Sequence, residues 1–588
     1  MGILRARGRR GLPCNELYRQ LFNPALFLMA WGRIYANHGA MTPGVSRETA
    51  DGMSLARIGR IIDALRHERY RSMPARRVYI PKKNGRKRPL GLPSWSDKLV
   101  GEVIRILLEA YYEPRFSGRS HGFRSRRGCH TALTEVARTW KGTTWFIEGD
   151  IADCFGSLDH EIMVSILAEH IHDNRFLRLI RGMLRAGYLE DWTWNATLSG
   201  APQGGVVSPI LSNIYLDRLD KYAETALIPE YTRGTSRKAN PAWQKMANAI
   251  TAAWRRGDRA TVRKLRQQRR SLPSKDPRDP DYRRLRYIRY ADDHLLGFTG
   301  PKAEAEQIKQ RLARFLHDEL RLELSAEKTL ITHARTQKAR FLGYDIIAQH
   351  SATRPAVNGV IGLRVPRDVI TAKQAPYLKH GTPWYRPRLL NLDDHQIIST
   401  YGAEYRGLVQ YYLLAGNVSQ LNRLHQAARV SMLKTLACKH RSTVTKMARK
   451  YQATIATPHG PRRCYEARTE RPGRKPLIAR FGGIPLKRQE RAVLDDRQPA
   501  PATTSRKEII TRLLNGKCEW CGQRAPVQTH QVARLADLGK PGPAQPAWAA
   551  LMAKIRRKTL IVCAPCHQAI HDGKPAACTP TSLESRMH

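Results

Sequence analysis

The sequence predicts a multidomain α+β protein. Its 588 residues exceed what a single hydrophobic core organises, so three to five domains are expected. Stretches with a helical hydrophobic period alternate with short strand-type runs bounded by Gly and Pro. Four of the ten cysteines are grouped as two CxxC pairs near the end of the chain, which indicates a small metal-stabilised module there.

The charge balance restricts the class of partner. The chain carries 101 Lys and Arg against 50 Asp and Glu, a formal net charge of +51. Such a surface repels itself unless a polyanion shares it, so nucleic acid is the expected partner. The sequence contains no run of 18 apolar residues and no secretory signal pattern. We therefore expect no membrane association and a cytoplasmic protein of bacterial type, near the nucleoid when it acts on DNA.

The elements of the first part follow from hydrophobic period and turn residues. Residues 1 to 73 are mostly helical. The segment "RRVYIPKKNGRKRPLGLPS" predicts a β-hairpin with Asn84-Gly85 at its tip. The next segment, "WSDKLVGEVIRILLEAYYEP", predicts an amphipathic helix that ends at Pro114. A buried strand then leads into Asp150, and a Gly/Pro-rich loop from Ser199 precedes another helix.

Basic segments dominate the second part. Between Arg255 and Arg289 there are 14 Lys or Arg against 4 Asp or Glu, which indicates a helical, solvated basic insertion. Residues 394 to 451 show a helical period. The span from 453 to 505 is rich in Arg, Pro and Gly and is interpreted as a linker or loosely folded arm.

The stretch "YIRYADDHLLGF", from Tyr287 to Phe298, places two adjacent carboxylates between two β-forming runs. This pattern predicts a hairpin with Asp292 and Asp293 at its tip, where like charges are stabilised by a cation. Asp150 ends another apolar run, and a neighbouring strand would bring it beside them. Three such carboxylates suit two Mg²⁺ ions that activate a 3′-hydroxyl and stabilise leaving pyrophosphate. The alternative is a simple surface turn capped by two Asp.

An ordered set of motifs accompanies these carboxylates. It comprises "YIPKKNGRKRPLGLPSWSDK", "SHGFRSRRGCHTAL", "GDIADCFGSLDH", "APQGGVVSPILSNIYLDRLD", "YIRYADDHLLGF", "LSAEKTLITH", "RFLGYDI" and "YRGLVQYY". In this order they resemble the group II intron-encoded proteins, which combine a reverse transcriptase and maturase with an HNH endonuclease module. The similarity covers nearly the whole chain.

The resemblance implies a right-hand polymerase with fingers, palm and thumb, an α-helical maturase domain and a small ββα-metal (HNH) zinc module. The implied domains are an N-terminal extension and fingers (1–140), a palm (141–350), a thumb or maturase X domain (355–455), a basic DNA-binding linker region (456–510) and the HNH module (511–588). The palm would contain a basic insertion at about 225–285.

The resemblance also implies roles for individual residues. Asp150 and Asp292 match the ligands of both Mg²⁺ ions, with Asp293 supporting them. Phe155 matches a steric gate that excludes a ribose 2′-hydroxyl, although ordinary core packing would also explain it. The remaining matches are Gln203 and Gly204 in the loop that orders the nucleotide, Lys82, Lys83 and Arg88 against the triphosphate, Lys328 as a general acid, and Tyr290 beneath the primer end.

The C-terminal Cys/His pattern predicts two metal sites. Cys518, Cys521, Cys563 and Cys566 form a strong structural Zn²⁺ signal, because four thiolates hold together a segment too small to fold alone. His530, His567 and His571 would bind one Mg²⁺ of a nuclease site. Gln531 departs from the family, in which a second histidine acts as general base, since a neutral amide takes no proton from water near pH 7. The alternative is a zinc-stabilised module that binds DNA without cleaving it.

The expected function is that of a ribonucleoprotein enzyme. It would bind its intron RNA, assist splicing, and copy the RNA from dNTPs at a DNA target while the endonuclease nicks the second strand. Two alternatives stay open, a splicing cofactor without catalysis and a reverse transcriptase of another lineage such as a retron or diversity-generating element. The sequence makes no prediction of oligomeric state.

Overall fold

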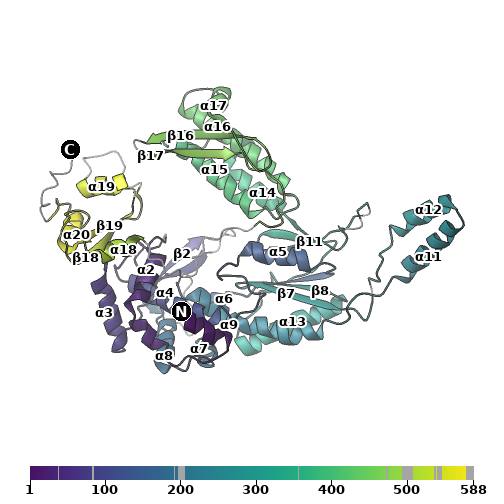
Figure 1. The fold of residues 1–588 in the computed structure, drawn as a ribbon, viewed down its shortest axis with the longest axis horizontal. Helices are drawn as coiled ribbons and strands as arrows, with labels where there is room; N and C mark the ends of the chain where they lie inside the picture. Colours follow the sequence, from purple (N-terminus) through teal and green to yellow (C-terminus); the bar gives the residue numbers. More distant parts are fainter. Residues whose placement is uncertain are drawn as a thin grey trace.

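The computed structural model describes most of the chain. It covers residues 1–588 apart from 38, 82–84, 86, 191–192, 196–204, 278, 352, 355–356, 472–473, 493–507, 536–537, 539–545, 556 and 578–588. Figure 1 shows a central mixed layer, a helical unit above it, a helical arm that extends away from the body, and a C-terminal module beside the N-terminal helices.

The N-terminal part is helical, as predicted. It contains α1 (Gly2–Arg9), η1 (Tyr18–Phe22), α2 (Pro24–Ile34) and α3 (Leu55–Arg66), preceded by the short strand β1 (Met53–Ser54). Asn23 and Ser54 cap α2 and α3 by accepting hydrogen bonds from backbone N–H groups of the first turn. The apolar stripe of α3, which includes Ile58, Ile61, Ile62 and Leu65, faces the core.

The predicted hairpin is present. Strands β2 (Ala75–Pro81) and β3 (Lys87–Leu92) pair antiparallel. Strand β2 also pairs in parallel with β5 (Tyr188–Glu190), and β5 pairs antiparallel with β6 (Thr193–Asn195). The predicted tip at Asn84 and the lysines Lys82 and Lys83 lie outside the described residues.

A four-stranded antiparallel sheet forms the centre of the molecule. Its order is β7 (Arg284–Tyr290), β8 (Asp293–Thr299), β4 (Trp145–Gly149) and β9 (Ile331–His333). Alternate residues face opposite sides. Ile147 and Leu296 join the core that includes α4, α9 and α13, whereas Phe146 and Leu295 join the core that includes α5 and the upper helical unit. The sheet is therefore covered on both faces.

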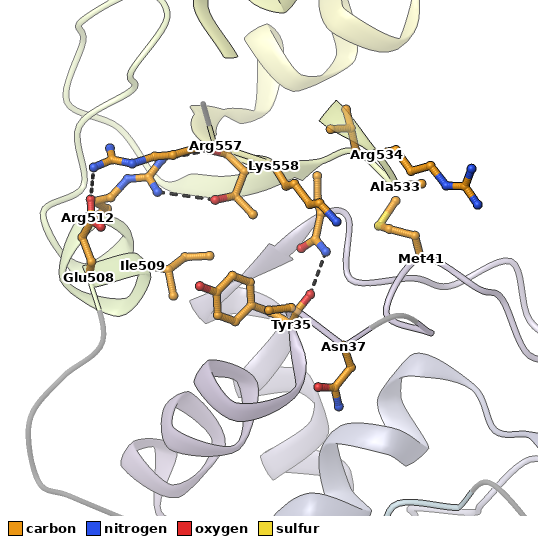
Figure 2. A pocket seen from close by; sticks show the side chains of 14 residues that line it. Tyr35, Asn37, Met41, Glu508, Ile509, Arg512, Ala533, Arg534, Arg557 and Lys558 are labelled. Carbon is orange, nitrogen blue, oxygen red and sulfur yellow. Dashed lines mark hydrogen bonds and ion pairs between the residues drawn. The ribbon is translucent and has the colours of Figure 1, made fainter. Parts of the chain in front are cut away.

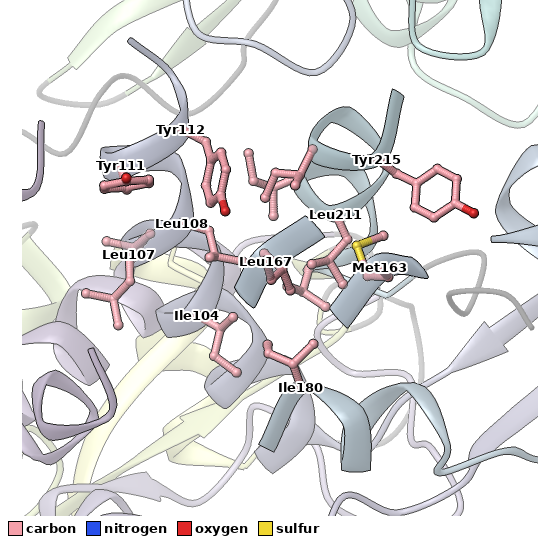
Figure 3. Packing of buried hydrophobic residues seen from close by; sticks show 14 of the residues in the cluster. Ile104, Leu107, Leu108, Tyr111, Tyr112, Met163, Leu167, Ile180, Leu211 and Tyr215 are labelled. Carbon is pink, nitrogen blue, oxygen red and sulfur yellow. The ribbon is translucent and has the colours of Figure 1, made fainter. Parts of the chain in front are cut away.

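Helices of different lengths surround this sheet, and the longer ones bury an apolar face. The surrounding helices are α4 (Trp95–Tyr112), α5 (Cys129–Thr139), α6 (Cys154–Ser157), α7 (His160–Ala168), α8 (Asn174–Leu184), α9 (Ser208–Tyr222), η2 (Ala223–Leu227), α10 (Ile228–Glu230) and α13 (Lys302–Leu320). Figure 3 shows side chains of α4, α7, α8 and α9 packed together, among them Leu107, Leu167, Ile180 and Leu211.

The basic insertion is helical, as predicted, but it begins earlier than the most basic stretch. It consists of α11 (Pro241–Arg255) and α12 (Arg259–Arg269), which pack on each other through Ile250, Ala253 and Val262. This small core is separate from the others, so the arm in Figure 1 projects with most of its side chains in solvent.

The upper helical unit follows a three-stranded sheet of β10 (Ala339–Phe341), β11 (Tyr344–Ala348) and β12 (Ile361–Arg364). Its own elements are α14 (Arg367–Gln374), η4 (Ala375–Tyr377), β13 (Leu378–Lys379), β14 (Thr382–Pro383), η5 (Pro387–Leu389), α15 (Asp394–Tyr411), η6 (Val418–Leu421), α16 (Asn422–Lys439) and α17 (Val444–Tyr451). The tyrosines of "YRGLVQYY" pack inward: Tyr405 lies against Phe481, and Tyr412 donates a hydrogen bond to the Gly343 carbonyl.

In the first part of the expected linker at 456–510, the structure has strands instead of a loosely folded arm. Strands β15 (Gln452–Ile455), β16 (Arg462–Arg471) and β17 (Arg474–Gly482) form an antiparallel sheet that packs on α15. Its inward residues, such as Ala467, Ala479 and Phe481, are few and mostly small, whereas arginines occupy much of the outer face. Because arginines dominate the composition, the alternation of apolar and polar residues that indicates a strand is not evident in the sequence.

The C-terminal module contains α18 (Glu508–Leu514), β18 (Val527–Gln531), α19 (Ala547–Ile555), β19 (Thr559–Cys563) and α20 (Ala564–His571). Its sheet has a third strand from the other end of the chain, since β1 pairs with β18. Ile509, Leu513 and Ile561 belong to the same hydrophobic cluster as the N-terminal helices. The module is thus docked on the N-terminal region, as Figure 1 shows.

Two glycines of α15 should respond oppositely to alanine. A Cβ at Gly402 would lie 2.1 Å from the Arg480 carbonyl oxygen of β17, whereas a Cβ at Gly407 meets nothing within 4 Å. We expect Gly402→Ala to destabilise this unit by about 1–3 kcal/mol through overpacking, and Gly407→Ala to stabilise it by up to about 1 kcal/mol through helix propensity. Thermal midpoints of the two variants check this, and equal shifts would contradict the close approach.

Candidate active site and metal centres

The strand register brings the three predicted carboxylates to one end of the central sheet. Gly149, the last residue of β4, lies opposite His294 of β8, so Asp150 emerges beside the turn between β7 and β8. Tyr290 pairs with Asp293, and the two-residue turn is therefore Ala291-Asp292. The prediction that both Asp292 and Asp293 occupy the tip is wrong by one residue, because Ala291 adopts a left-handed φ of 56° and takes the first turn position.

A buried arginine holds this turn. Arg289 is fully buried, and its Nη2 donates to Asp220 Oδ2 over 2.5 Å. Its Nη1 donates to the carbonyl oxygen of Ala291 over 2.8 Å, at the apex itself. Burial alone would lower the pKa of the guanidinium, but the Asp220 charge outweighs it and the pKa of Arg289 is raised. The turn is therefore fixed by a permanent internal cation.

The same network reaches two other segments. Arg289 also donates to Ser120 Oγ and Asn213 Oδ1, and Asn213 Nδ2 donates to the Gly122 carbonyl over 2.9 Å. A Cβ at Gly122 would lie 2.2 Å from the Ala291 nitrogen, so this glycine allows the backbone to approach the turn. The sequence did not indicate these residues as a group, although they lie within the motifs "SHGF" and "SNIYLDRLD".

Burial, reinforced by mutual repulsion, raises the proton affinity of Asp292 and Asp293. Burial raises the pKa of Asp292, and the charge of Asp150 adds to the rise while Lys328 and Arg88 oppose it. Burial, the charges of Asp292 and Asp150, and a hydrogen bond with Asp150 raise the pKa of Asp293 to about 7. Burial also lowers the pKa of the adjacent His294 to about 4, so this ring is neutral and offsets none of the negative charge. The cluster is an environment that a cation would stabilise.

Lys328, which the resemblance offers as a general acid, lies against Asp150. Its Nζ is 2.7 Å from Asp150 Oδ2, and this hydrogen bond raises the pKa of the ammonium group. The backbone positions the pair, because Ser325 N donates to the Asp150 carbonyl and Ala152 N donates to the Glu323 carbonyl, both over 2.8 Å. The Lys328 side chain remains largely exposed.

The other predicted residues are distributed around this cluster. Arg88 is exposed on β3, and its charge lowers the pKa of Asp292, which places it in electrostatic reach of the site. Phe155 is half-buried on α6 and packs edge-to-face with the exposed Phe123. Tyr290, the last residue of β7, is half-buried. Lys82, Lys83, Gln203 and Gly204 lie outside the described residues.

The four predicted cysteines converge. The Sγ atoms of Cys518, Cys521, Cys563 and Cys566 all lie within 4.8 Å of one another, and all four side chains are buried and free of disulfides. Cys521 N donates to Cys518 Sγ, and Gly522 in a left-handed conformation closes the turn that carries the first pair. Four thiols on two short knuckles fit tetrahedral Zn²⁺.

The three predicted histidines also converge, and a residue that the sequence did not indicate joins them. Ligand atoms of His530 on β18, His567 and His571 on α20, and Asp51 from the N-terminal region all lie within 4.8 Å of one another. Burial opposes ionisation of Asp51, but contacts with His530 and His567 outweigh it and hold the pKa of Asp51 well below its usual range. Asp51 precedes a Gly in an ordinary turn sequence, so no local pattern distinguishes it.

The side-chain amide of Gln531 points away from this cluster. Its Nε2 donates to the Tyr35 carbonyl over 2.8 Å, and its backbone N–H donates to Asp51 Oδ1 over 2.7 Å. Figure 2 shows this contact at the edge of an interdomain cavity of ≈ 320 Å³, whose lining includes Met41, Glu508, Arg512 and Arg557. Gln531 thus links the module to the N-terminal region.

Known families match three consecutive parts of the chain. The family described as "Reverse transcriptase (RNA-dependent DNA polymerase)" matches residues 80–346, "Type II intron maturase" matches 361–467, and "AI2M/AI1M-like, HNH endonuclease" matches 518–567. Together with the central sheet and its carboxylates, these matches define a right-hand reverse transcriptase that carries a maturase domain and an HNH endonuclease domain.

Relatives of the whole chain give the family. The chain is 36% identical to the group II intron-encoded protein LtrA of Lactococcus lactis subsp. cremoris, over 95% of this chain and 96% of that protein. It is 33% identical to an uncharacterised 91 kDa protein in the cob intron of Schizosaccharomyces pombe, over 95% of this chain and 70% of that protein. The chain belongs to the group II intron-encoded proteins. Among its described residues, every helix is too short or too polar to cross a lipid bilayer.

The raised pKa of Asp293 predicts that Asp293→Asn increases the stability of the folded protein by an amount that depends on pH. The pKa is about 7 in the folded protein and about 3.9 in an unfolded chain. Between these values the folded state binds a proton that the unfolded state lacks, so stability falls as pH rises through this window. In Mg²⁺-free buffer the variant should therefore be more stable than the parent at pH 8, by about 1–3 kcal/mol, because one pKa unit corresponds to about 1.4 kcal/mol.

Thermal midpoints between pH 5 and pH 8 check this expectation, with the gain shrinking toward pH 5. Asp281→Asn is the matched control, because Asp281 is exposed and pairs with Lys238 far from the site. A gain from Asp293→Asn that is the same at every pH would show that Asp293 is not protonated in the folded protein.

Proposed function

We propose that this reverse transcriptase polymerises DNA on an RNA template through two Mg²⁺ ions held by Asp150 and Asp292, with Asp293 supporting them. The observation that carries the proposal is the convergence of three mutually repelling carboxylates beside the same turn. Oxygen ligands of this kind are those that Mg²⁺ prefers. When bound, Mg²⁺ ions activate the primer 3′-hydroxyl and neutralise the charge on the triphosphate.

The protein residues around the cluster would position the nucleotide. Arg88 lies on the β2–β3 hairpin within electrostatic reach of Asp292, where a guanidinium suits phosphate oxygens. Lys82 and Lys83 would extend this positive surface. Lys328 would donate a proton to the departing pyrophosphate from its place beside Asp150. Phe155 would limit the space at the sugar, Gln203 and Gly204 would order the nucleotide, and Tyr290 would support the primer end.

The basic surfaces would hold nucleic acid. On α12 only Val262 is buried, and the exposed face is dominated by Arg and Lys. The sheet of β15 to β17 presents further arginines on its outer face. With a net charge of +51, these surfaces suit the phosphate backbone of the intron RNA during splicing and of the DNA target during insertion.

The C-terminal module would use structural Zn²⁺ at its four cysteines and would nick the second DNA strand weakly. Gln531 carries no basic group, and its amide is engaged with the Tyr35 carbonyl. A neutral amide in this position takes no proton from water, so the usual general base is absent from residue 531.

Asp292→Asn should separate polymerisation from RNA binding. We expect primer extension on an RNA template to fall by at least about 100-fold, comparable to the loss of other groups that stabilise transition-state charge. Binding of intron RNA and splicing assistance should remain, because they depend on many cations spread over the surface. Asp318→Asn, at an exposed position on α13, is the control. Equal loss of both activities in Asp292→Asn would contradict the proposed division of roles.

Cys566→Ser should remove zinc and loosen the C-terminal module. Metal analysis of the purified protein is expected to show the loss of one zinc per chain, and limited proteolysis should show faster cleavage between residues 508 and 571. Cys438→Ser is the matched control, since Cys438 is exposed on α16 outside the cluster. Primer extension should persist, and unchanged zinc content in Cys566→Ser would contradict the Cys₄ assignment.

A further inference from the structure

The carboxylate of Asp51 occupies the centre of the histidine cluster. His571 Nε2 lies 2.9 Å from Asp51 Oδ2, and His567 Nε2 lies 3.2 Å from the same oxygen. His530 Nδ1 lies 3.5 Å from Asp51 Oδ1. Three imidazoles from the nuclease module therefore surround one carboxylate from the opposite end of the chain.

The backbone fixes Asp51 in this position from both sides. Gly52 N donates to the Thr529 carbonyl over 2.8 Å, and Met53 and Ser54 continue into the pairing of β1 with β18. On the other side, the Gln531 N–H donates to Asp51 Oδ1, although Gln531 lies 480 positions further along the chain. Asp51 is thus held by main-chain contacts and does not depend on the histidines for its placement.

The cluster contains a buried ring nitrogen without a hydrogen-bond partner. His530 is 5% exposed, and among the described residues its Nε2 has no hydrogen bond while its Nδ1 has only the 3.5 Å contact with Asp51 Oδ1. A buried imidazole nitrogen without a partner is costly unless a further ligand occupies the site. His571 has the most exposed side chain of the four, 49% against 16% for Asp51, so the cluster opens to solvent beside it.

We propose that Asp51 is a ligand of the nuclease metal ion, so that the endonuclease site is completed by the N-terminal domain of the reverse transcriptase. The inference rests on the HNH module described above and extends it across the domain boundary. Three imidazoles and one carboxylate suit a first-row transition-metal dication such as Mn²⁺ or Zn²⁺ better than Mg²⁺, which prefers oxygen ligands.

Shared ligation links metal binding to docking. A dication bound by Asp51 and the histidines stabilises the docked arrangement by the free energy of its binding, and undocking removes one of four ligands. This arrangement also gives a role to Gln531. Its backbone N–H orients the Asp51 carboxylate, and its amide ties β18 to the Tyr35 carbonyl, so the residue supports the shared site instead of taking a proton.

The test uses the full-length protein loaded with one zinc per chain, which fills the four cysteines and leaves the histidine cluster open. It also carries Asp150→Asn and Asp292→Asn, which remove Mn²⁺ binding at the polymerase carboxylates. Mn²⁺ is titrated while the free ion is followed by electron paramagnetic resonance. We expect one tight site in this parent, and a loss of affinity of at least about 10-fold on adding Asp51→Asn, in line with ligand-shell mutations elsewhere. Asn keeps the oxygen that accepts from Gln531 N–H, so the fold and docking are preserved.

Two further variants separate the possible results. Asp63→Asn alters an exposed carboxylate of the same N-terminal domain and should leave Mn²⁺ affinity unchanged. His571→Ala should lower it. If Asp51→Asn binds as tightly as the parent while His571→Ala does not, the histidine site stands and ligation by Asp51 is overturned. If both bind as tightly as the parent, the metal site itself is overturned, whereas the polymerase assignment is untouched.

Hydrogen–deuterium exchange gives a second readout that does not depend on affinity. Mn²⁺ should slow exchange of the backbone amides at Gly52 to Ser54 and along β18 in the parent, because the ion strengthens docking. The same addition should have no effect in the Asp51→Asn variant. Faster exchange at Gly52 to Ser54 on adding Mn²⁺ would mean that the ion displaces the carboxylate, and it would overturn the proposal.

Discussion

Repulsion among Asp150, Asp292 and Asp293 is the constraint around which the centre of this molecule is built. Three half-buried carboxylates at one end of a sheet do not stay together by themselves. The antiparallel register of β4 and β8 fixes their backbones, and the segment around Ser325 is hydrogen-bonded to Asp150 and Ala152. Arg289 then clamps the turn through the Ala291 carbonyl while its own charge is balanced by Asp220. The site is preorganised by groups that do not face the substrate.

The cysteine cluster and the histidine cluster of the C-terminal module are held in place by different parts of the chain. The four cysteines belong to a single small unit and hold its two knuckles together, as expected for a segment with a minimal core. The histidine cluster lies instead at the junction with the N-terminal region, where β1 adds to the module's sheet. The nuclease and the polymerase therefore form one connected body, in which strand pairing, a shared hydrophobic cluster and the Gln531 contacts all join the two ends of the chain.

Local patterns in the sequence were enough to predict the carboxylate turn, the cysteine cluster and the pair of histidines on one helix. The β-forming runs around Asp292 and the CxxC spacing each express a short-range rule, and so does the four-residue step between His567 and His571. Long-range partners were not predictable in this way. Asp51 has no distinguishing neighbours, and its role depends on a pairing between distant strands. Arg289 was counted among the solvated basic residues, whereas the fold buries it completely. The strands at 462–482 were missed because arginines on their outer face obscured the alternation.

The joint binding of two metal ions by Asp150 and Asp292 is tested most directly by anomalous diffraction. The crystals would contain the protein with an RNA template, a DNA primer, a non-reactive deoxynucleotide and Mn²⁺ in place of Mg²⁺. We expect two anomalous peaks within bonding distance of the Asp150 and Asp292 carboxylates, about 3.5–4 Å apart as in other two-metal sites. The absence of any peak shared by these two residues, in a complex with ordered primer and nucleotide, would contradict joint binding.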